Sequence, residues 1–149
     1  MSERIETAAL RDFSVSLCRA AGLSADDAAL LTDSILFAEC RGVTSHGLLR
    51  LPQYIARLRS GATASNVPMP FTMESGGTAR LDAQNGLGQL AGRKASDKAE
   101  ELAAKYGVSF VAVANSNHFG TGAWYAIPAA RRGFFAFNIS SAASAMAPH

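Results

Sequence analysis

Two residues four positions apart, His46 and Arg50, carry side chains that could bind and process a small carboxylate. Histidine gives or takes a proton near neutral pH, and the flat guanidinium of arginine matches a carboxylate with two parallel hydrogen bonds. If the segment were one helix, positions i and i+4 would lie on one face and both side chains could reach one ligand. The alternative is a surface arginine beside a capping or core-edge histidine.

A second polar cluster follows the apolar run Val108–Ala114, which is typical of a buried strand. This cluster, residues 115–122, is rich in asparagine and glycine and contains His118. Loops at the carboxyl ends of strands are where ligands gather in open α/β sheets, and glycines permit close backbone approach. The alternative is a polar turn whose asparagines bond their own backbone.

The elements that must position these residues begin with three predicted helices. Ser24 is an expected N-cap, and Gly22 and Gly42 are expected helix stops. Pro52 fits only the first turn of a helix, so His46 precedes the helix that begins near Arg50. We therefore expect His46 and Arg50 to lie close together, but not strictly on one helix face. The nearby helix amino terminus favours an anion. The predicted helices cover residues 6–21, 24–41 and about 49–60.

Strands alternate with helices in the rest of the chain. After an extended linker over residues 61–70, the pattern predicts a hairpin of strands 71–74 and 78–81, a helix over 87–106 closed by Gly107, the strand 108–114, a helix over 122–132 despite Pro128, and a buried strand over 134–140. The fold class is therefore α/β (α+β). We expect a helical segment over residues 1–65 and an α/β segment over 66–149.

Composition favours an ordinary globular protein of 149 residues, with 48% hydrophobic and 17% charged residues. A net charge of +2 does not point to a nucleic-acid partner, and Arg57 and Arg59 are expected on a solvated helix face. Cys18 and Cys40 have no metal-like spacing and are expected as small core residues in a reducing compartment, without a disulfide. The amino terminus does not resemble a signal peptide, and no apolar run approaches the roughly 20 residues that span a bilayer. We expect a cytoplasmic protein.

Three ordered motifs carry a family resemblance. The segments Ser45–Tyr54 (SHGLLRLPQY), Asn117–Gly120 (NHFG) and Met146–Pro148 (MAP) resemble the malate/L-lactate dehydrogenase family of NAD(P)-dependent oxidoreductases. That family includes ureidoglycolate and sulfolactate dehydrogenases. The similarity runs from about Leu10 to the last residue, and it covers only the amino-terminal part of the longer family enzymes. It implies the start of a non-Rossmann, largely antiparallel nucleotide-binding domain, and the sequence has no G-x-G-x-x-G motif.

The resemblance also implies residue roles in the oxidation of a small 2-hydroxy acid or the reduction of a 2-oxo acid. His118 would be the acid/base, with His46 and Arg50 holding the substrate carboxylate or carbonyl. Ser45 and Tyr54 would join them in binding substrate, although Tyr54 could equally be an aromatic packed at a domain edge. A hydrolase with Ser45 as nucleophile is disfavoured because the sequence has no nucleophile elbow.

The resemblance implies NAD or NADP as cofactor and no metal. Ser140 and Ser141 stand where the family commonly has a Thr-Asn pair, which puts the cofactor contact of that segment in doubt. A homodimer is implied as well. The rival hypothesis is a stand-alone small-acid-binding or dimerisation module without redox activity. The expected cofactor-binding residues are Gly120, Ser140, Ser141, Ala142, Met146 and Pro148.

Overall fold

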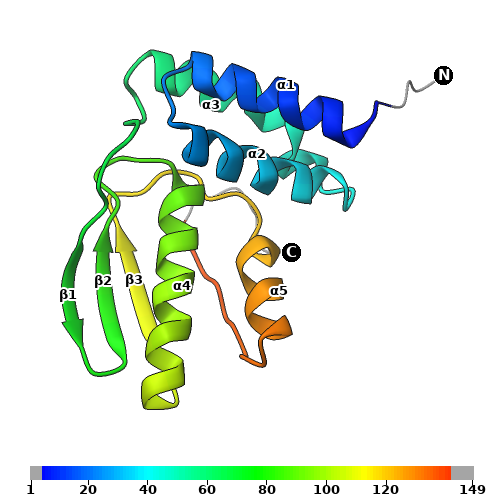
Figure 1. Cartoon of the computed structure of the whole chain (residues 1–149). Coiled ribbons are helices and arrows are strands. Elements are labelled where there is room, and N and C mark those ends of the chain that lie inside the picture. The colour runs from blue at the N-terminus through cyan, green and yellow to red at the C-terminus, as the bar shows by residue number, and fades with distance from the viewer. Residues whose placement is uncertain (1–4, 142–149) are drawn as a thin grey trace, which may run out of the picture.

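The computed structural model describes residues 5–141, in which a layer of helices lies above an α/β unit (Figure 1). Helices α1 (Thr7–Ala20), α2 (Ala25–Glu39) and α3 (Leu51–Arg59) form the helical layer. Below it, the long helix α4 (Gly88–Tyr106) lies between a small sheet on one side and helix α5 (Ala123–Arg131) on the other (Figure 1). The predicted α/β class is confirmed.

Local signals explain where the helices begin and end. The Ser24 hydroxyl accepts a hydrogen bond from the Asp27 backbone N–H at 3.1 Å, as predicted for an N-cap. Pro52 lies in the first turn of α3, where its missing N–H costs no hydrogen bond. Gly107 closes α4 at φ 85°, a left-handed conformation that glycine adopts without strain. These helices match their predicted ranges to within about two residues.

The three strands form a mixed sheet in the order β1-β2-β3. Strands β1 (Phe71–Ser75) and β2 (Thr78–Asp82) make the predicted antiparallel hairpin. Strand β3 (Phe110–Ala114) pairs parallel to β2, with Leu81 opposite Val113, and α4 forms the crossover between them. One of the two described pairings is thus antiparallel and the other parallel. The parallel pairing brings the end of β3, and the loop that follows it, to the helical layer.

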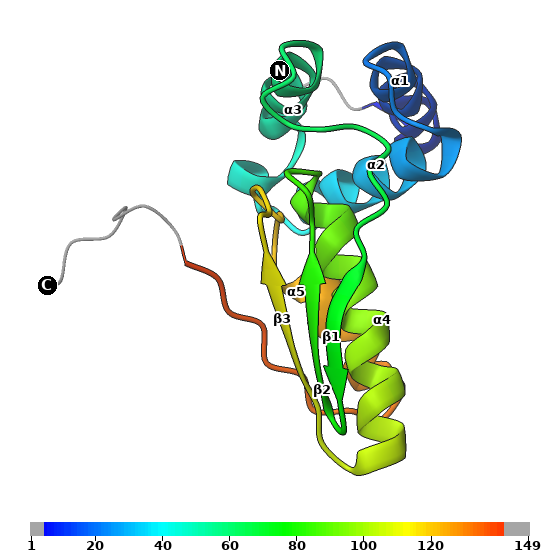
Figure 2. The ribbon, with the colours of Figure 1, turned by 90° about the vertical axis from the view of Figure 1, so that its left-hand side faces the viewer.

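Residues 108–114 are predicted to form a buried strand, and the structure has a strand there that is not buried. Strand β3 begins only at Phe110, which is 61% exposed, and the strand is the edge of the sheet. Helix α4 covers one face of the sheet, and the face turned to the viewer in Figure 2 carries no described helix. An apolar run therefore identifies a strand, but whether it is buried depends on what covers it.

The predicted strand over residues 134–140 is also wrong. The segment is irregular, and Phe135 and Phe137 are 95% and 79% exposed. A strand needs a neighbour to accept its backbone hydrogen bonds, and none of the described strands pairs with this segment. Composition alone cannot supply that neighbour.

One further burial prediction fails in the helical layer. Cys40 is exposed because it follows the last turn of α2 as the C-cap residue, whereas Cys18 is fully buried as predicted. In α1, Ser14 and Cys18 lie one helical turn apart and face the core, and Phe13 is 60% exposed. The buried side of α2 includes Leu31 and Ile35.

Two apolar clusters hold the layers together. The first lies between α1, α2 and α3 and includes Leu31, Ile35 and Leu58. The second lies between the sheet and α4 and includes Leu81 and Ala91. Leu90 of α4 packs against both clusters, so this helix links the helical layer to the sheet. The proposed division into residues 1–65 and 66–149 stays a prediction.

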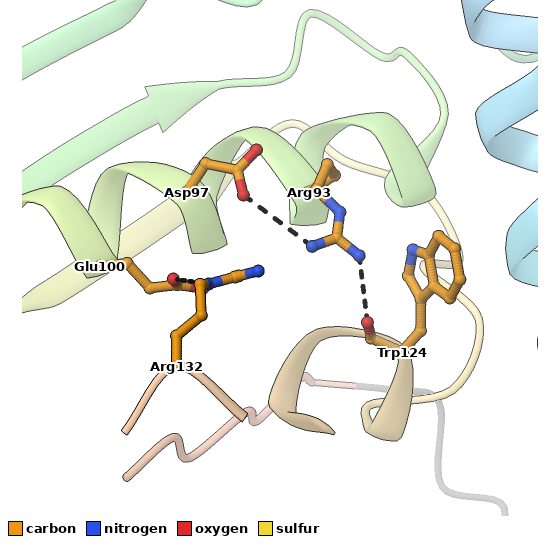
Figure 3. A network of polar contacts seen from close by, with 5 residues as sticks. All are labelled: Arg93, Asp97, Glu100, Trp124 and Arg132. Atoms are coloured by element: carbon orange, nitrogen blue, oxygen red, sulfur yellow. Dashed lines mark hydrogen bonds and ion pairs between the residues drawn. The ribbon is translucent and has the colours of Figure 1, made fainter. Parts of the chain in front are cut away.

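Polar contacts join α5 and the residue that follows it to α4 (Figure 3). They thereby hold the end of the loop that runs from β3 to α5. Arg93 donates to the Trp124 carbonyl at 3.1 Å, and Arg132 pairs with Glu100 through two hydrogen bonds. The Trp124 indole also meets Phe37 of α2 edge-on, at 5.2 Å between ring centroids. Among residues 5–141, no helix is both long enough and apolar enough to cross a membrane.

Candidate active site

The segment around His46 consists of two short 3₁₀ helices rather than the start of one α-helix. Helices η1 (Thr44–His46) and η2 (Leu48–Arg50) join at Gly47, and the Leu48 backbone N–H donates to the Glu39 carboxylate at 2.8 Å. Gly47 packs against that same carboxylate, so a side chain there would displace it. The strict i/i+4 geometry is therefore wrong, and Glu39 of α2 positions the turn that carries His46.

The loop that carries His118 is held by an asparagine clamp. The Asn117 side-chain amide donates to the Asn85 carbonyl at 2.9 Å and to the Gly86 carbonyl at 3.0 Å. Its oxygen accepts a hydrogen bond from Arg57 at 2.9 Å. Two distant segments, the turn at Asn85–Gly86 and helix α3, thus contact one side chain next to His118. The loop is an anchored turn, and the asparagine bonds distant backbone rather than only its own.

The two histidines meet although 72 positions of sequence separate them. The rings of His46 and His118 lie 5.3 Å apart between centroids, at an interplanar angle of 30°. Their convergence, which the sequence analysis expected, is present in the structure. The Ser45 hydroxyl lies 2.9 Å from Nδ1 of His46 and so orients that ring. Partial removal of His118 from water, followed by the charges of Arg50 and His46, lowers the pKa of His118 below its ordinary value.

Tyr54 is buried behind His118 and is hydrogen-bonded on two sides. Its hydroxyl lies 2.7 Å from Nδ1 of His118 and accepts a hydrogen bond from Gln89 of α4 at 2.7 Å. Burial raises the pKa of Tyr54 above its ordinary value, partly opposed by the Gln89 hydrogen bond and the Arg50 charge. A hydroxyl engaged in this way orients His118, so direct binding of a substrate carboxylate by Tyr54 stays only a prediction.

Arg50 lies beside the histidines, and two of its three guanidinium nitrogens already donate hydrogen bonds within the protein. Its Nε donates to the Ser45 carbonyl at 2.7 Å and one terminal nitrogen donates to Gln53 at 3.0 Å. The other terminal nitrogen has no protein partner among the described residues. Arg50 does not line the cavity described next, but its charge affects the pKa of both His118 and Tyr54. It can therefore attract an anion to the histidines.

An open cavity of about 1070 Å³ adjoins the two histidines. It lies between α4, β3, α5 and the irregular segment after α5. Both polar and aromatic groups line it, a mixture typical of small-molecule sites. Among the lining residues are His46, His118, Phe119, Asn138, Ser140 and Ser141.

The expected cofactor-binding residues fall in three places. Ser140 and Ser141 line the cavity that His118 also lines. Gly120 is buried behind it at φ 79°, next to Ser34 and Gln89. Ala142, Met146 and Pro148 lie outside the described residues. Within residues 5–141, no three His, Cys, Asp or Glu side chains gather closely enough to hold a metal ion.

Sequence reasoning missed the residues that position the histidines. Arg57 was expected on a solvated face, yet it reaches Asn117. Gln89 is a polar residue between Leu87 and Leu90, and no motif marks it as part of the site. In the structure it is buried in the first turn of α4. Their contacts join residues far apart in the chain, and no spacing rule reveals such contacts.

Comparison with known proteins decides the family. The sequence matches the malate/L-lactate dehydrogenase family over residues 5–149. This chain belongs to that family. It is 34% identical over 145 residues to a malate dehydrogenase of Pyrococcus abyssi, an alignment that covers 97% of this chain and 40% of the relative. It is 37% identical over 127 residues to an L-sulfolactate dehydrogenase of Methanocaldococcus jannaschii, covering 85% of this chain and 37% of the relative.

Solved structures agree with the sequence comparison. The malate dehydrogenase of Pyrococcus horikoshii superposes with a TM-score of 0.85 at 32% identity, covering 88% of this chain and 38% of that one.

Other relatives by sequence include a 2,3-diketo-L-gulonate reductase of Escherichia coli, 34% identical over 107 residues, covering 72% of this chain and 32% of the relative. The chain spans about 40% of the length of the first relatives it matches. Its named relatives are oxidoreductases of small hydroxy or oxo acids.

Proposed function

We propose that this chain supplies the substrate-binding and acid–base part of an NAD(P)-dependent oxidoreductase that interconverts a small 2-hydroxy acid and its 2-oxo acid. The observation that carries the proposal is the meeting of His46 and His118 at 5.3 Å beside a guanidinium and a large cavity. Such a reaction needs a proton donor and acceptor at the substrate oxygen and a cation for the carboxylate.

His118 is the proposed acid/base. In the oxidation it takes the proton of the substrate hydroxyl, and in the reduction it returns that proton to the oxygen of the carbonyl. Its lowered pKa favours the neutral ring at physiological pH, which is the form that can act as a base. His46, oriented by Ser45, donates a hydrogen bond to the substrate, and Arg50 attracts the carboxylate.

The residues present fit a nicotinamide cofactor. The cavity is of the size that small-molecule and cofactor sites have, and it brings the Ser140 and Ser141 hydroxyls to the site that His118 lines. Ser140 and Ser141 would hold the polar edge of the nicotinamide, as far as the described residues go. When bound, the cofactor accepts or gives the hydride. One relative, a (2R)-3-sulfolactate dehydrogenase of Chromohalobacter salexigens, is named as an NADP(+) enzyme.

The proposal extends to assembly and location. Family resemblance supports a homodimer, and two free thiols, one of them exposed, are what a reducing compartment such as the cytoplasm maintains. Gel filtration with light scattering tests the dimer, and a mass of one chain would contradict it.

Turnover by the whole protein tests the proposed function. Oxidation of NADH or NADPH is followed with a panel of 2-oxo acids, in the parent protein and in His118→Ala. The variant should lose at least about 100-fold in kcat, the low end of general acid–base effects. Arg59→Lys, a change at an exposed arginine of α3, is the control for handling and folding. Absence of turnover with every acid would favour the small-acid-binding module instead.

A further inference from the structure

The Tyr54 hydroxyl links His118 to Gln89, and the hydrogens in this link can be counted. The hydroxyl has one hydrogen, and it lies 2.7 Å from both Nδ1 of His118 and Nε2 of Gln89. An amide NH₂ only donates, so the Tyr54 oxygen accepts from Gln89 and its own hydrogen points to Nδ1. A neutral His118 then carries its hydrogen on Nε2. In that form Nε2 donates a hydrogen bond but cannot take a proton.

Among residues 5–141, Tyr54 is the only hydrogen-bond partner of the Gln89 side-chain amide. The side chain is fully buried, at 0% exposure, and its Oε1 has no hydrogen-bond partner among residues 5–141. Buried amide oxygens without partners are uncommon and costly. If the amide turns by half a revolution, Oε1 takes the place of Nε2 opposite Tyr54 and the number of hydrogen bonds is unchanged.

The turned amide gives His118 the opposite tautomer. Tyr54 then donates its hydrogen to Oε1 of Gln89, and Nδ1–H of His118 donates to the Tyr54 oxygen. Nε2 is left with its lone pair in the neutral ring and with a hydrogen in the imidazolium ring. The neutral ring and the imidazolium ring keep the same hydrogen bond from Nδ1–H to the Tyr54 oxygen. The ring can therefore take and return a proton at Nε2 without rearranging its neighbours.

We propose that Gln89 is a positioning residue for the acid–base step: its buried amide turns to accept the Tyr54 hydrogen, and this frees Nε2 of His118 to exchange a proton with the substrate. The proposal rests on the proposed function. The hydrogens balance in two steps. When the amide turns, the ring gives its Nε2 hydrogen to water and takes one from water at Nδ1. In the acid–base step the proton then moves only between the substrate oxygen and Nε2, and Tyr54 and Gln89 keep all their hydrogens throughout. Gln89 itself does not line the cavity and touches no substrate.

Two substitutions separate this role from a purely structural one. In Gln89→Met the only partner left for the Tyr54 hydrogen among the described residues is Nδ1, so the hydrogen of neutral His118 stays on Nε2. The kcat should fall by about 10- to 100-fold with little change in KM, and the pKa of His118 should fall. In Gln89→Glu the carboxylate only accepts, so it holds the working arrangement. The kcat should stay within about threefold of the parent value, and the pKa of His118 should rise.

The readouts are steady-state kinetics and ¹⁵N NMR of the histidine rings in the whole protein. The shifts of Nδ1 and Nε2 report the tautomer, and their titration reports the pKa. The other titratable or charged groups that face His118 are His46, Arg50 and Tyr54, and they are unchanged in both variants. Thr32→Val, which removes another fully buried polar group from α2, is the control for lost stability.

The outcomes are distinct. Opposite pKa shifts in the two variants, with kcat kept in Gln89→Glu and lost in Gln89→Met, support the proposal. Equal losses in both variants, or an unmoved tautomer of His118, overturn it and leave Gln89 a packing residue. A parent protein without turnover contradicts the proposed function instead, and the NMR titration then still decides which tautomer Gln89 selects.

Discussion

The substitution Gly88→Ala tests whether the first turn of α4 sets the position of His118. A Cβ at residue 88 would lie 2.5 Å from the His118 carbonyl oxygen and closer still to that of Asn117, whereas real Cβ contacts stay above 3.0 Å. The loop must therefore retreat by more than about 0.5 Å, because the Asn117 carbonyl oxygen lies closer to the added Cβ than the His118 oxygen does. That shift reaches the tolerance of about 0.5 Å within which catalytic groups must be held.

We expect the retreat to lengthen the 2.7 Å contact between His118 and Tyr54 and to reduce kcat/KM by about 10- to 100-fold, since a displacement of about 1 Å can cost 100-fold. The pKa of His118 should rise toward its ordinary value as the ring gains water. The free energy of unfolding should fall by no more than about 1–3 kcal/mol, the usual cost of overpacking, partly offset by the helix propensity of alanine.

The assay is steady-state kinetics of the whole protein, with Gly122→Ala as the matched control. A Cβ at residue 122 meets only Asn138, at an ordinary 3.7 Å, and the backbone there is right-handed. The control should keep the parent kinetics. Parent-like kinetics and an unchanged His118 pKa in Gly88→Ala would refute the claim that this close approach positions the histidine.

Three further predictions follow from the site and from the cysteines. Arg50→Lys should mainly raise KM for the oxo acid, because lysine cannot reproduce the two-pronged contact, and an unchanged KM would remove Arg50 from the site. Because burial lowers the pKa of His118 and reduction needs the imidazolium form, kcat/KM for reduction should fall as pH rises through that pKa, whereas a profile flat between pH 5 and 8 would contradict the role of His118. Cys40 should react with a maleimide in the folded protein, whereas Cys18, buried and with a raised pKa, should react only on unfolding, and equal rates would contradict the burial of Cys18.

The parts of the fold that the sequence predicts well are those set by local chemistry. Ser24, Pro52 and Gly107 each act on their own helix end, so the helices appear where expected. The hairpin of β1 and β2 has the same local origin in its glycine turn. Burial fails as a prediction at Phe110 and over residues 134–140, because it depends on a covering layer that a pattern does not contain.

The candidate site likewise contains residues that the sequence predicts and residues that it does not. His46 and His118 were predicted to meet because each belongs to a motif of the family, and the structure brings them together. The residues that orient them, Glu39, Arg57 and Gln89, make hydrogen bonds across 9, 60 and 35 positions of the chain. Such partners are set by the packing of distant segments, and no motif marks them in the sequence.

We propose that His46, His118 and Arg50 serve one site for a small carboxylate. The most direct test follows the ring ¹⁵N signals of both histidines while malate is added to the whole protein with its cofactor. Both rings should shift together and saturate at one Kd, and Arg50→Ala should weaken this binding. Signals that saturate at two different concentrations, or a shift in one ring alone, would contradict the claim.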